Sequence, residues 1–242
     1  MLKNKVKNPS LKIVSNLVLS VLVVSVGALC LAPAQTGTSA DGNKTQIYRS
    51  AGENGVGVSL MFNVYWGTEE VYRILDILEE YDAKASFFVG GCWADDNVDC
   101  LKAIYQEGHE IGNHGYFHKD HAKLNLLANQ KEIADCNRFI KLAIGTECTL
   151  FAPPSGAYND NTLSACQMLN MKTILWSKDT IDWRDKNASL VYTRATKNIQ
   201  SGDFVLMHPM PHTADALDDI LKYYKNNSLK VVTVSENLQE NV

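Results

Sequence analysis

The sequence predicts one α/β domain in which parallel strands alternate with helices. Its 242 residues are 45% hydrophobic and 21% charged, which is close to the average for globular proteins. From residue 56 onward, short runs of β-forming residues alternate with longer runs that have the period of a helix. Strands separated by helices are typical of parallel sheets and barrels. We therefore expect an α/β sheet or barrel.

The expected elements follow one another in strict alternation. Seven short apolar runs are expected to be strands: Val56–Phe62, Ala85–Val89, Glu110–Asn113, Leu150–Ala152, Lys172–Trp176, Phe204–Met207 and Lys230–Val232. Six longer periodic segments between them are expected to be helices: Glu69–Tyr81, Asp95–Glu107, Leu127–Ile144, Asn159–Asn170, Leu190–Gln200 and Ala214–Tyr224.

The N-terminal segment predicts export of the chain. Lysines precede an apolar run over Leu17–Leu31, and Ala32-Pro33-Ala34 supplies small residues at the spacing of a cleavage site. Residues 1–34 are therefore expected to be a signal peptide. The alternative is an uncleaved membrane anchor, because an apolar run of about 15 to 20 residues is borderline for spanning a bilayer. The expected location is secreted or extracytoplasmic and membrane-anchored.

Composition divides the rest of the chain into a tether and a domain. Residues 35–55 are rich in Gly, Ser, Thr, Asn and Gln, which predicts a flexible tether before a domain over residues 56–242. The 23 basic residues against 27 acidic ones give a net charge of −4, which argues against nucleic acid as a partner. We expect the single domain to be a monomer.

Polar residues cluster where the expected strands end. In parallel α/β folds, ligands bind at the carboxyl ends of the strands, so these residues are expected to converge on one rim. They are Asn63, Trp66 and Glu69, then His114 and His118, then Pro153, Pro154 and Ser155, then Asp179, Asp182 and Trp183, and finally His208 and His212.

Two of these residues suggest a metal site. His114 and His118 are four residues apart, and on one helical turn this spacing points both imidazoles the same way. Two imidazoles on one side suit zinc or a similar divalent metal. By itself the spacing also fits two surface or core histidines, but its place directly after a strand favours a ligand site.

Four segments resemble motifs of the polysaccharide deacetylase (NodB homology) family. Gly108–His114 followed by His118 is similar to its second motif, and Phe151–Gly156 is similar to its R-x-P-Y-G segment. Asp179–Trp183 resembles its D-x-x-D-W segment, and Leu206–His208 resembles its L-x-H segment. The order and spacing agree over nearly the whole expected domain. The resemblance implies a distorted (β/α)7 barrel.

The resemblance implies a hydrolase that removes acetyl groups from a cell-wall or extracellular polysaccharide, such as peptidoglycan or a chitin-like chain, and acts on C–N bonds other than peptide bonds. A divalent metal, most simply zinc, would polarise the acetyl carbonyl and lower the pKa of its bound water. His114 and His118 would hold the metal, His208 would be the general acid, and Asp182 would orient supporting groups. The expected substrate contacts are Trp66, Tyr116, Pro154, Ser155 and Trp183.

The first family motif, T-F-D-D, is altered in this chain to Met61-Phe62-Asn63-Val64. Asn63 stands at the position of the general base, although an amide cannot accept a proton near neutral pH. Val64 stands at the position of a metal-binding Asp, and an alkyl group cannot coordinate. Ala152 replaces the Arg that holds the base in the family. The sporulation-associated branch of the family looks similar at this motif.

Two interpretations of the altered motif remain open. In the first, the chain is a carbohydrate de-N-acetylase in which Glu69 completes the metal site or serves as the base, and Asp179 or Asp182 contributes from the opposite side. The alternative for Glu69 is an ordinary place in the first turn of a helix, where the dipole favours it. In the second, the chain is a catalytically inactive relative that binds glycan in the ancestral groove, where aromatic side chains stack on sugars.

Overall fold

The computed structural model describes residues 46–239. The expected signal peptide or anchor and residues 35–45 of the expected tether lie outside this range. Within residues 46–239, no helix is long and apolar enough to cross a membrane.

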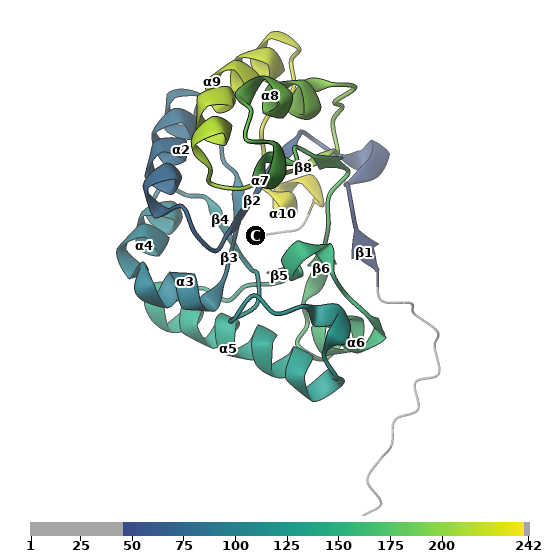
Figure 1. Cartoon of the computed structure of the whole chain (residues 1–242). Helices are drawn as coiled ribbons and strands as arrows, with labels where there is room; N and C mark the ends of the chain where they lie inside the picture. Colours follow the sequence, from purple (N-terminus) through teal and green to yellow (C-terminus); the bar gives the residue numbers. More distant parts are fainter. Residues whose placement is uncertain (1–45, 240–242) are drawn as a thin grey trace, which may run out of the picture. The chain divides into compact units, whose positions relative to one another are not determined.

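The described residues form one curled parallel sheet with helices packed on its outer side (Figure 1). All neighbouring pairs of strands are parallel, and their order is β1-β6-β5-β4-β3-β2-β8-β7. The strands are β1 Ile47–Tyr48, β2 Ser59–Val64, β3 Ser86–Val89, β4 Glu110–Asn113, β5 Leu150–Phe151, β6 Lys172–Ile174, β7 Lys178–Asp179 and β8 Phe204–Met207. This arrangement confirms the α/β barrel class.

Helices lie between the successive strands from β2 to β6 and between β7 and β8, as the alternation in the sequence predicted, and the last two helices follow β8. They are α2 Thr68–Glu80, α3 Gly91–Asp96, α4 Val98–Gln106, α5 Leu126–Ile144, α6 Asp160–Met168, α7 Asp182–Asp185, α8 Ala188–Thr196, α9 Pro211–Asn226 and α10 Val234–Asn237. Three 3₁₀ turns accompany them: η1 Gly52–Asn54, η2 His121–Lys123 and η3 Pro154–Gly156.

The ends of the domain differ from the expected tether and strands. Order begins before Val56, because β1 pairs with β6 and the amide of Leu175 donates to the carbonyl of Tyr48 at 2.7 Å. The prediction of a flexible tether is therefore wrong for the part of it that forms β1 and η1. The expected last strand, Lys230–Val232, makes only a single bridge between Val231 and Val58, and the sheet gains β7 instead.

Strand β2 shows how the core has two layers. Leu60, Phe62 and Val64 point outward into the main apolar cluster between the sheet and its helices. Met61 points the other way, into a smaller apolar cluster inside the barrel. Asn63 follows the same alternation and faces inward at the carboxyl end of the strand, because successive side chains of a strand point to opposite faces.

The amino-terminal end of the barrel is closed by α10. Val234 joins the inner apolar cluster, and the buried side chain of Asn237 ties α10 to the chain before β2. Its Nδ2 donates to the carbonyl of Gly57 at 2.8 Å and to Ser59 Oγ at 3.0 Å, while its Oδ1 accepts from the amide of Val56 at 3.0 Å.

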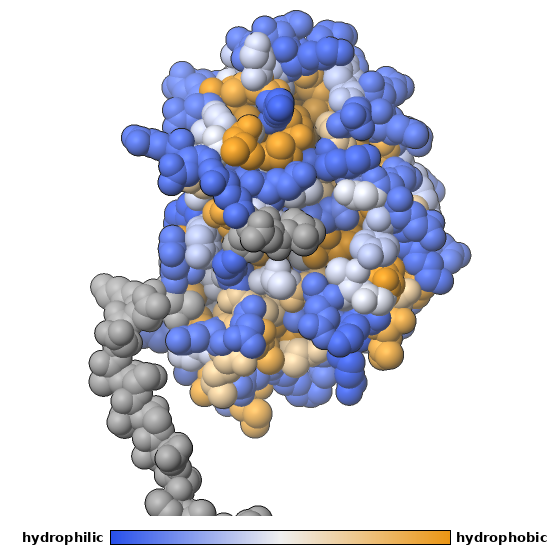
Figure 2. All heavy atoms as spheres, turned by 180° about the vertical axis from the view of Figure 1, so that it is seen from behind, coloured by the Kyte–Doolittle hydropathy of each residue, from blue (hydrophilic) through white to orange (hydrophobic). Residues whose placement is uncertain are grey.

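The face opposite to that of Figure 1 is mostly hydrophilic, with separate apolar areas (Figure 2).

A glycine before α2 brings two loops together at the other end of the barrel. Gly67 has a φ of 79°, and a Cβ there would lie 2.2 Å from the carbonyl oxygen of Pro209. Only glycine permits this approach. As a result Trp66, which precedes Gly67, lies beside His208, which precedes Pro209: their rings are nearly parallel, at 4°, with centroids 6.1 Å apart.

Candidate functional site

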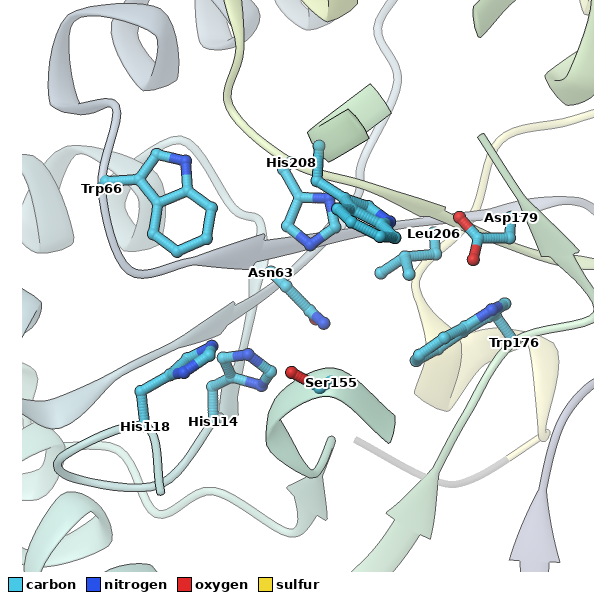
Figure 3. A pocket seen from close by; sticks show the side chains of 10 residues that line it. Asn63, Trp66, His114, His118, Ser155, Trp176, Asp179, Leu206 and His208 are labelled. Carbon is cyan, nitrogen blue, oxygen red and sulfur yellow. The ribbon is translucent and has the colours of Figure 1, made fainter. Parts of the chain in front are cut away.

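A cavity of about 390 Å³ opens at the carboxyl ends of the strands, where the sequence placed the site. Figure 3 shows the side chains around it, which come from β2, β7 and β8 and from the segments that follow β2, β4, β5, β6, β7 and β8. We call this cavity the cleft. Its lining residues are Asn63, Trp66, His114, His118, Ser155, Trp176, Asp179, Trp183, Leu206 and His208.

The two expected metal ligands meet at one side of the cleft. The ring centroids of His114 and His118 are 5.1 Å apart. The Nδ1 of His114 donates to the carbonyl of Ala152 at 2.7 Å, which leaves Nε2 toward the cleft. Burial, together with the nearby His118, lowers the pKa of His114 to about 3, and burial also lowers the pKa of His118. Both imidazoles are therefore neutral near neutral pH.

The expectation that this pair lies on one helical turn is wrong. The two histidines sit on a loop after β4, in which Gly115 and His118 have φ values of 76° and 52°. Glu132 of α5, which is 3% exposed, fixes this loop: it accepts from the amide of Phe117 at 2.8 Å and pairs with Lys119 at 2.8 Å. Sequence reasoning missed Glu132, because no motif marks a helix residue that contacts a distant loop.

A buried carboxylate holds the opposite side of the cleft. Asp182 is fully buried, and its Oδ1 accepts from Nδ1 of His208 at 2.7 Å. Its Oδ2 accepts from the amide of His208 at 2.7 Å and from Thr213 Oγ1 at 2.8 Å. Burial alone would raise the pKa of Asp182, but the hydrogen bonds from His208 and Thr213 outweigh it, so the pKa lies below its usual value. Nε2 of His208 is thereby directed to the cleft.

Sequence reasoning placed Asp182 on the rim, whereas the structure places it behind His208 as a positioning residue. Two further neighbours support Asp182. Thr213 donates to its carboxylate, and Nε2 of His212 donates to its backbone carbonyl at 2.7 Å. The sequence placed His212 near the rim but gave no sign of Thr213, because a threonine in the first turn of α9 carries no signal of such a role.

Three tryptophans form the walls of the cleft. Trp66 and Trp183 were expected there, and they are 41% and 51% exposed, so their rings are available to a ligand. Trp176 was not expected at the site, because it was assigned to the last position of a strand. The strand β6 ends two residues earlier, at Ile174, and Trp176 lines the cleft. Ser155 also lines the cleft, and its φ of 56° is rare for a residue with a side chain.

Two of the expected substrate contacts do not line the cleft. Pro154 is buried within η3. Tyr116 packs against the backbone of Gly91, where a Cβ would lie 2.2 Å from the tyrosine ring. Its side chain is therefore turned toward α3.

The altered first motif is the most unusual part of the site. Asn63 is 3% exposed and faces the cleft, yet its Oδ1 has no hydrogen-bond partner among residues 46–239. Val64 packs in the outer apolar cluster, and Ala152 is buried in the inner one. Neither carboxylate of the family motif nor its arginine has a substitute at these positions.

The donor set does not fit the expected three-ligand metal centre. In the described part of the chain, no group of three His, Cys, Asp or Glu side chains is arranged to hold a metal ion. Glu69, the expected third ligand, lies exposed in the first turn of α2 and does not line the cleft. This position agrees with the alternative interpretation, in which Glu69 is an ordinary acidic residue in the first turn of a helix. His114 and His118 alone fall short of the three protein ligands that catalytic zinc sites use.

Comparison with known proteins identifies the family. The family model described as polysaccharide deacetylase matches residues 52–174. A peptidoglycan-N-acetylglucosamine deacetylase from Bacillus cereus is 34% identical over 173 residues, which cover 69% of this chain and 81% of that protein. This chain belongs to the polysaccharide deacetylase family, and its assignment as a deacetylase-like hydrolase rests on that membership.

Particular relatives differ in what their names state. Uncharacterized protein YlxY from Bacillus subtilis is 36% identical over 183 residues, which cover 76% of this chain and only 57% of YlxY. The structure of BA3943, a CE4 family pseudoenzyme from Bacillus anthracis, matches with a TM-score of 0.78 and 34% identity over 82% of this chain and 71% of that one. A BA3943 mutant with restored enzymatic activity matches with the same TM-score and 32% identity, over 82% of this chain and 74% of that one.

Replacing the buried carboxylate tests its role in holding the cleft. We expect Asp182→Asn to reduce the free energy of unfolding by roughly 1–3 kcal/mol at neutral pH, because donors to Asp182 lose their charged acceptor. A carboxyl group with a depressed pKa stabilises the fold above its unfolded pKa of about 4, and this contribution is lost as the pH falls through the folded value. The deficit of the variant should therefore shrink below about pH 4 in urea unfolding.

Asp219→Asn is the matched control, because Asp219 is an exposed carboxylate on α9. Its effect should stay within about 0.5 kcal/mol at every pH. An equal loss of stability in both variants would contradict the assigned role of Asp182.

Proposed function

We propose that this chain binds an N-acetylated, peptidoglycan-type glycan in the cleft and hydrolyses it far more slowly than the named deacetylases do. The observation that carries the proposal is an intact ligand cleft whose first motif offers Asn63 and Val64 in place of two carboxylates. Binding walls are retained, whereas the groups that would activate water are missing. The proposal thus extends the family assignment to a binding role.

The walls of the cleft support binding of a sugar chain. Trp66 and Trp183 present partly exposed rings on one cavity, and an aromatic face buries the apolar face of a sugar ring. Trp66 is also held in place by its parallel packing against His208. Rigid aromatic walls reduce the entropy that binding would cost.

The chemistry of the inner wall supports slow turnover. Hydrolysis of an acetamide needs an activated water molecule, and a general base contributes typically 10²–10⁴-fold to such a reaction. Asn63 cannot take up a proton at neutral pH, and Val64 packs into the apolar core. The names of the relatives agree with both halves of the proposal, because they include peptidoglycan deacetylases and a CE4 pseudoenzyme.

A second candidate function is residual deacetylation, which one observation favours. His208 and Asp182 keep the geometry of an oriented proton donor, with 2.7 Å between Nδ1 and Oδ1. This pair would protonate a leaving amine if another group activated water. Its retention also has a purely structural explanation, because Asp182 bonds Thr213 and the backbone of His208.

Truncation of the tryptophans tests the binding role. We expect Trp66→Ala and Trp183→Ala each to weaken binding of N-acetylated chitotetraose by about tenfold, because each removes an aromatic wall. Titration calorimetry with the full chain measures the change.

Tyr105→Ala is the matched control, because Tyr105 lies on α4 and is 41% exposed, as Trp66 is. It should leave the affinity unchanged. If the wild-type chain shows no saturable binding, or if the three variants bind equally well, the proposed function is wrong.

Restoration of the inward-facing carboxylate of the first motif tests the cause of slow turnover. We expect Asn63→Asp to release acetate from N-acetylated chitotetraose about 100-fold faster than the wild-type chain, because it returns a general base to the wall of the cleft. Acetate release is measured by an enzymatic acetate assay.

The control Asn63→Gln keeps an amide at this position and supplies no carboxylate. It should stay near the wild-type rate. A wild-type chain that releases acetate as fast as Asn63→Asp would show that the missing carboxylate does not limit the reaction and would favour the second candidate function.

We also propose that the chain is exported, with residues 1–34 as a signal peptide or membrane anchor. The lysines, the apolar run and the small residues at Ala32–Ala34 support this location. The mass of the protein isolated from its host should correspond to loss of residues 1–34. An intact N-terminus in a soluble fraction would contradict it.

A further inference from the structure

We propose that Asn63 recognises the amide N–H of an acetamido group, so that the cleft selects N-acetylated over O-acetylated sugars. This inference rests on the proposed function and adds to it the residue that reads the acetyl linkage. Asn63, which stands at the position of the family's catalytic base, is then a contact that determines specificity.

The first support is the burial of Asn63 without a partner. Its side chain is 3% exposed, and its Oδ1 accepts no hydrogen bond within the described range. Nearly all buried polar side-chain atoms in proteins have a partner, and those that lack one deserve an explanation. A ligand that donates a hydrogen bond to Oδ1 provides that explanation.

The second support is the direction of the side chain. Asn63 ends β2 on its inward face and points into the cleft, between the pair His114 and His118 on one side and His208 on the other (Figure 3). A group that reaches the inner wall of the cleft therefore meets the Asn63 amide. No side chain in the described part of the chain competes for its Oδ1.

The chemistry of the wall indicates which ligand group fits. His114 donates its Nδ1 proton to the carbonyl of Ala152, so the Nε2 of its neutral ring offers an acceptor to the cleft. Oδ1 of Asn63 is a further acceptor. An acetamido group brings an N–H donor to such a wall, whereas an acetate ester has an oxygen at the same position and leaves Oδ1 unpaired.

The amide also differs from the carboxylate that it replaces. Both accept a hydrogen bond, but an amide stays neutral and does not take up the proton. Asn63 therefore holds an acetamido group without beginning its hydrolysis. The packing of Val64 in the outer core agrees with this, because it leaves Asn63 as the polar group of the altered motif that faces the ligand.

Two ligands that differ only in the linking atom test the inference. The full chain is titrated by calorimetry, in the presence of a chelator, with N-acetylated chitotetraose and with cellotetraose O-acetylated at its 2-hydroxyls. We expect about tenfold tighter binding of the N-acetylated ligand, because the ester leaves a buried acceptor without a partner. Asn63→Leu should abolish this preference, and Asn63→Asp, which keeps an acceptor oxygen, should retain it.

Each outcome separates this inference from the proposed function. Equal binding of both ligands to the wild-type chain, or a preference that Asn63→Leu leaves intact, overturns the role of Asn63 while cleft binding stands. No binding of either ligand overturns the proposed function itself. The comparison of the two ligands on the wild-type chain needs no variant, so a variant that fails to fold does not prevent the test.

The stability of Asn63→Leu gives an independent readout. Replacement of a buried amide whose Oδ1 has no partner by an apolar side chain of similar size should keep or raise the midpoint of thermal unfolding. A lower midpoint would mean that Asn63 serves the fold, which contradicts a role reserved for the ligand.

Discussion

The carboxylate of Asp182 is the interaction on which one half of the cleft depends. It joins the start of α7 to the end of β8 and to α9, through His208 and Thr213. Because the carboxylate is fully buried, its hydrogen bonds act in a low dielectric, where they fix the His208 ring most effectively. Trp66 packs on the His208 ring, so the position of this wall of the cleft depends on the buried carboxylate of Asp182.

The opposite half of the cleft lacks the two carboxylates of the family's first motif, which are replaced by Asn63 and Val64. The alternation of side chains along β2 explains why these two residues suit their positions. Asn63 faces inward to the cleft, whereas Val64 faces outward into apolar packing. An alkyl side chain suits the environment of position 64, and Ala152 suits the apolar interior of the barrel. The substitutions are therefore consistent with one another. They leave a cleft with neutral histidines on one side, an oriented histidine on the other and an amide between them.

Sequence reasoning was most successful where the information was local. Periodicity identified the main strands and helices, and the motif positions placed His114, His118 and His208 on one cleft. Periodicity did not identify the two-residue strands β1 and β7. Two residues are too few to show a period, and these strands exist because they pair with β6 and β8. The turn between the histidines was wrong because positive φ values at Gly115 and His118 replace a helix.

Long-range contacts account for the remaining differences at the site. Glu132 lies on a helix that follows the loop it fixes, and Trp176 depends on where β6 ends. The directions of Tyr116 and Glu69 were wrong for a related reason, since close packing on Gly91 and the course of α2 turn them from the cleft. Patterns in the sequence identify which residues follow a strand, but the backbone decides where their side chains point.

The most direct test of this account is zinc titration calorimetry of the full chain, with the His114→Ala/His118→Ala variant as the control. Because the described residues offer no third ligand beside this pair, the account predicts no zinc binding to the wild-type chain beyond that of the control. Near-stoichiometric binding that disappears in the control would show that a metal centre persists, and it would contradict the claim that the altered first motif removed it.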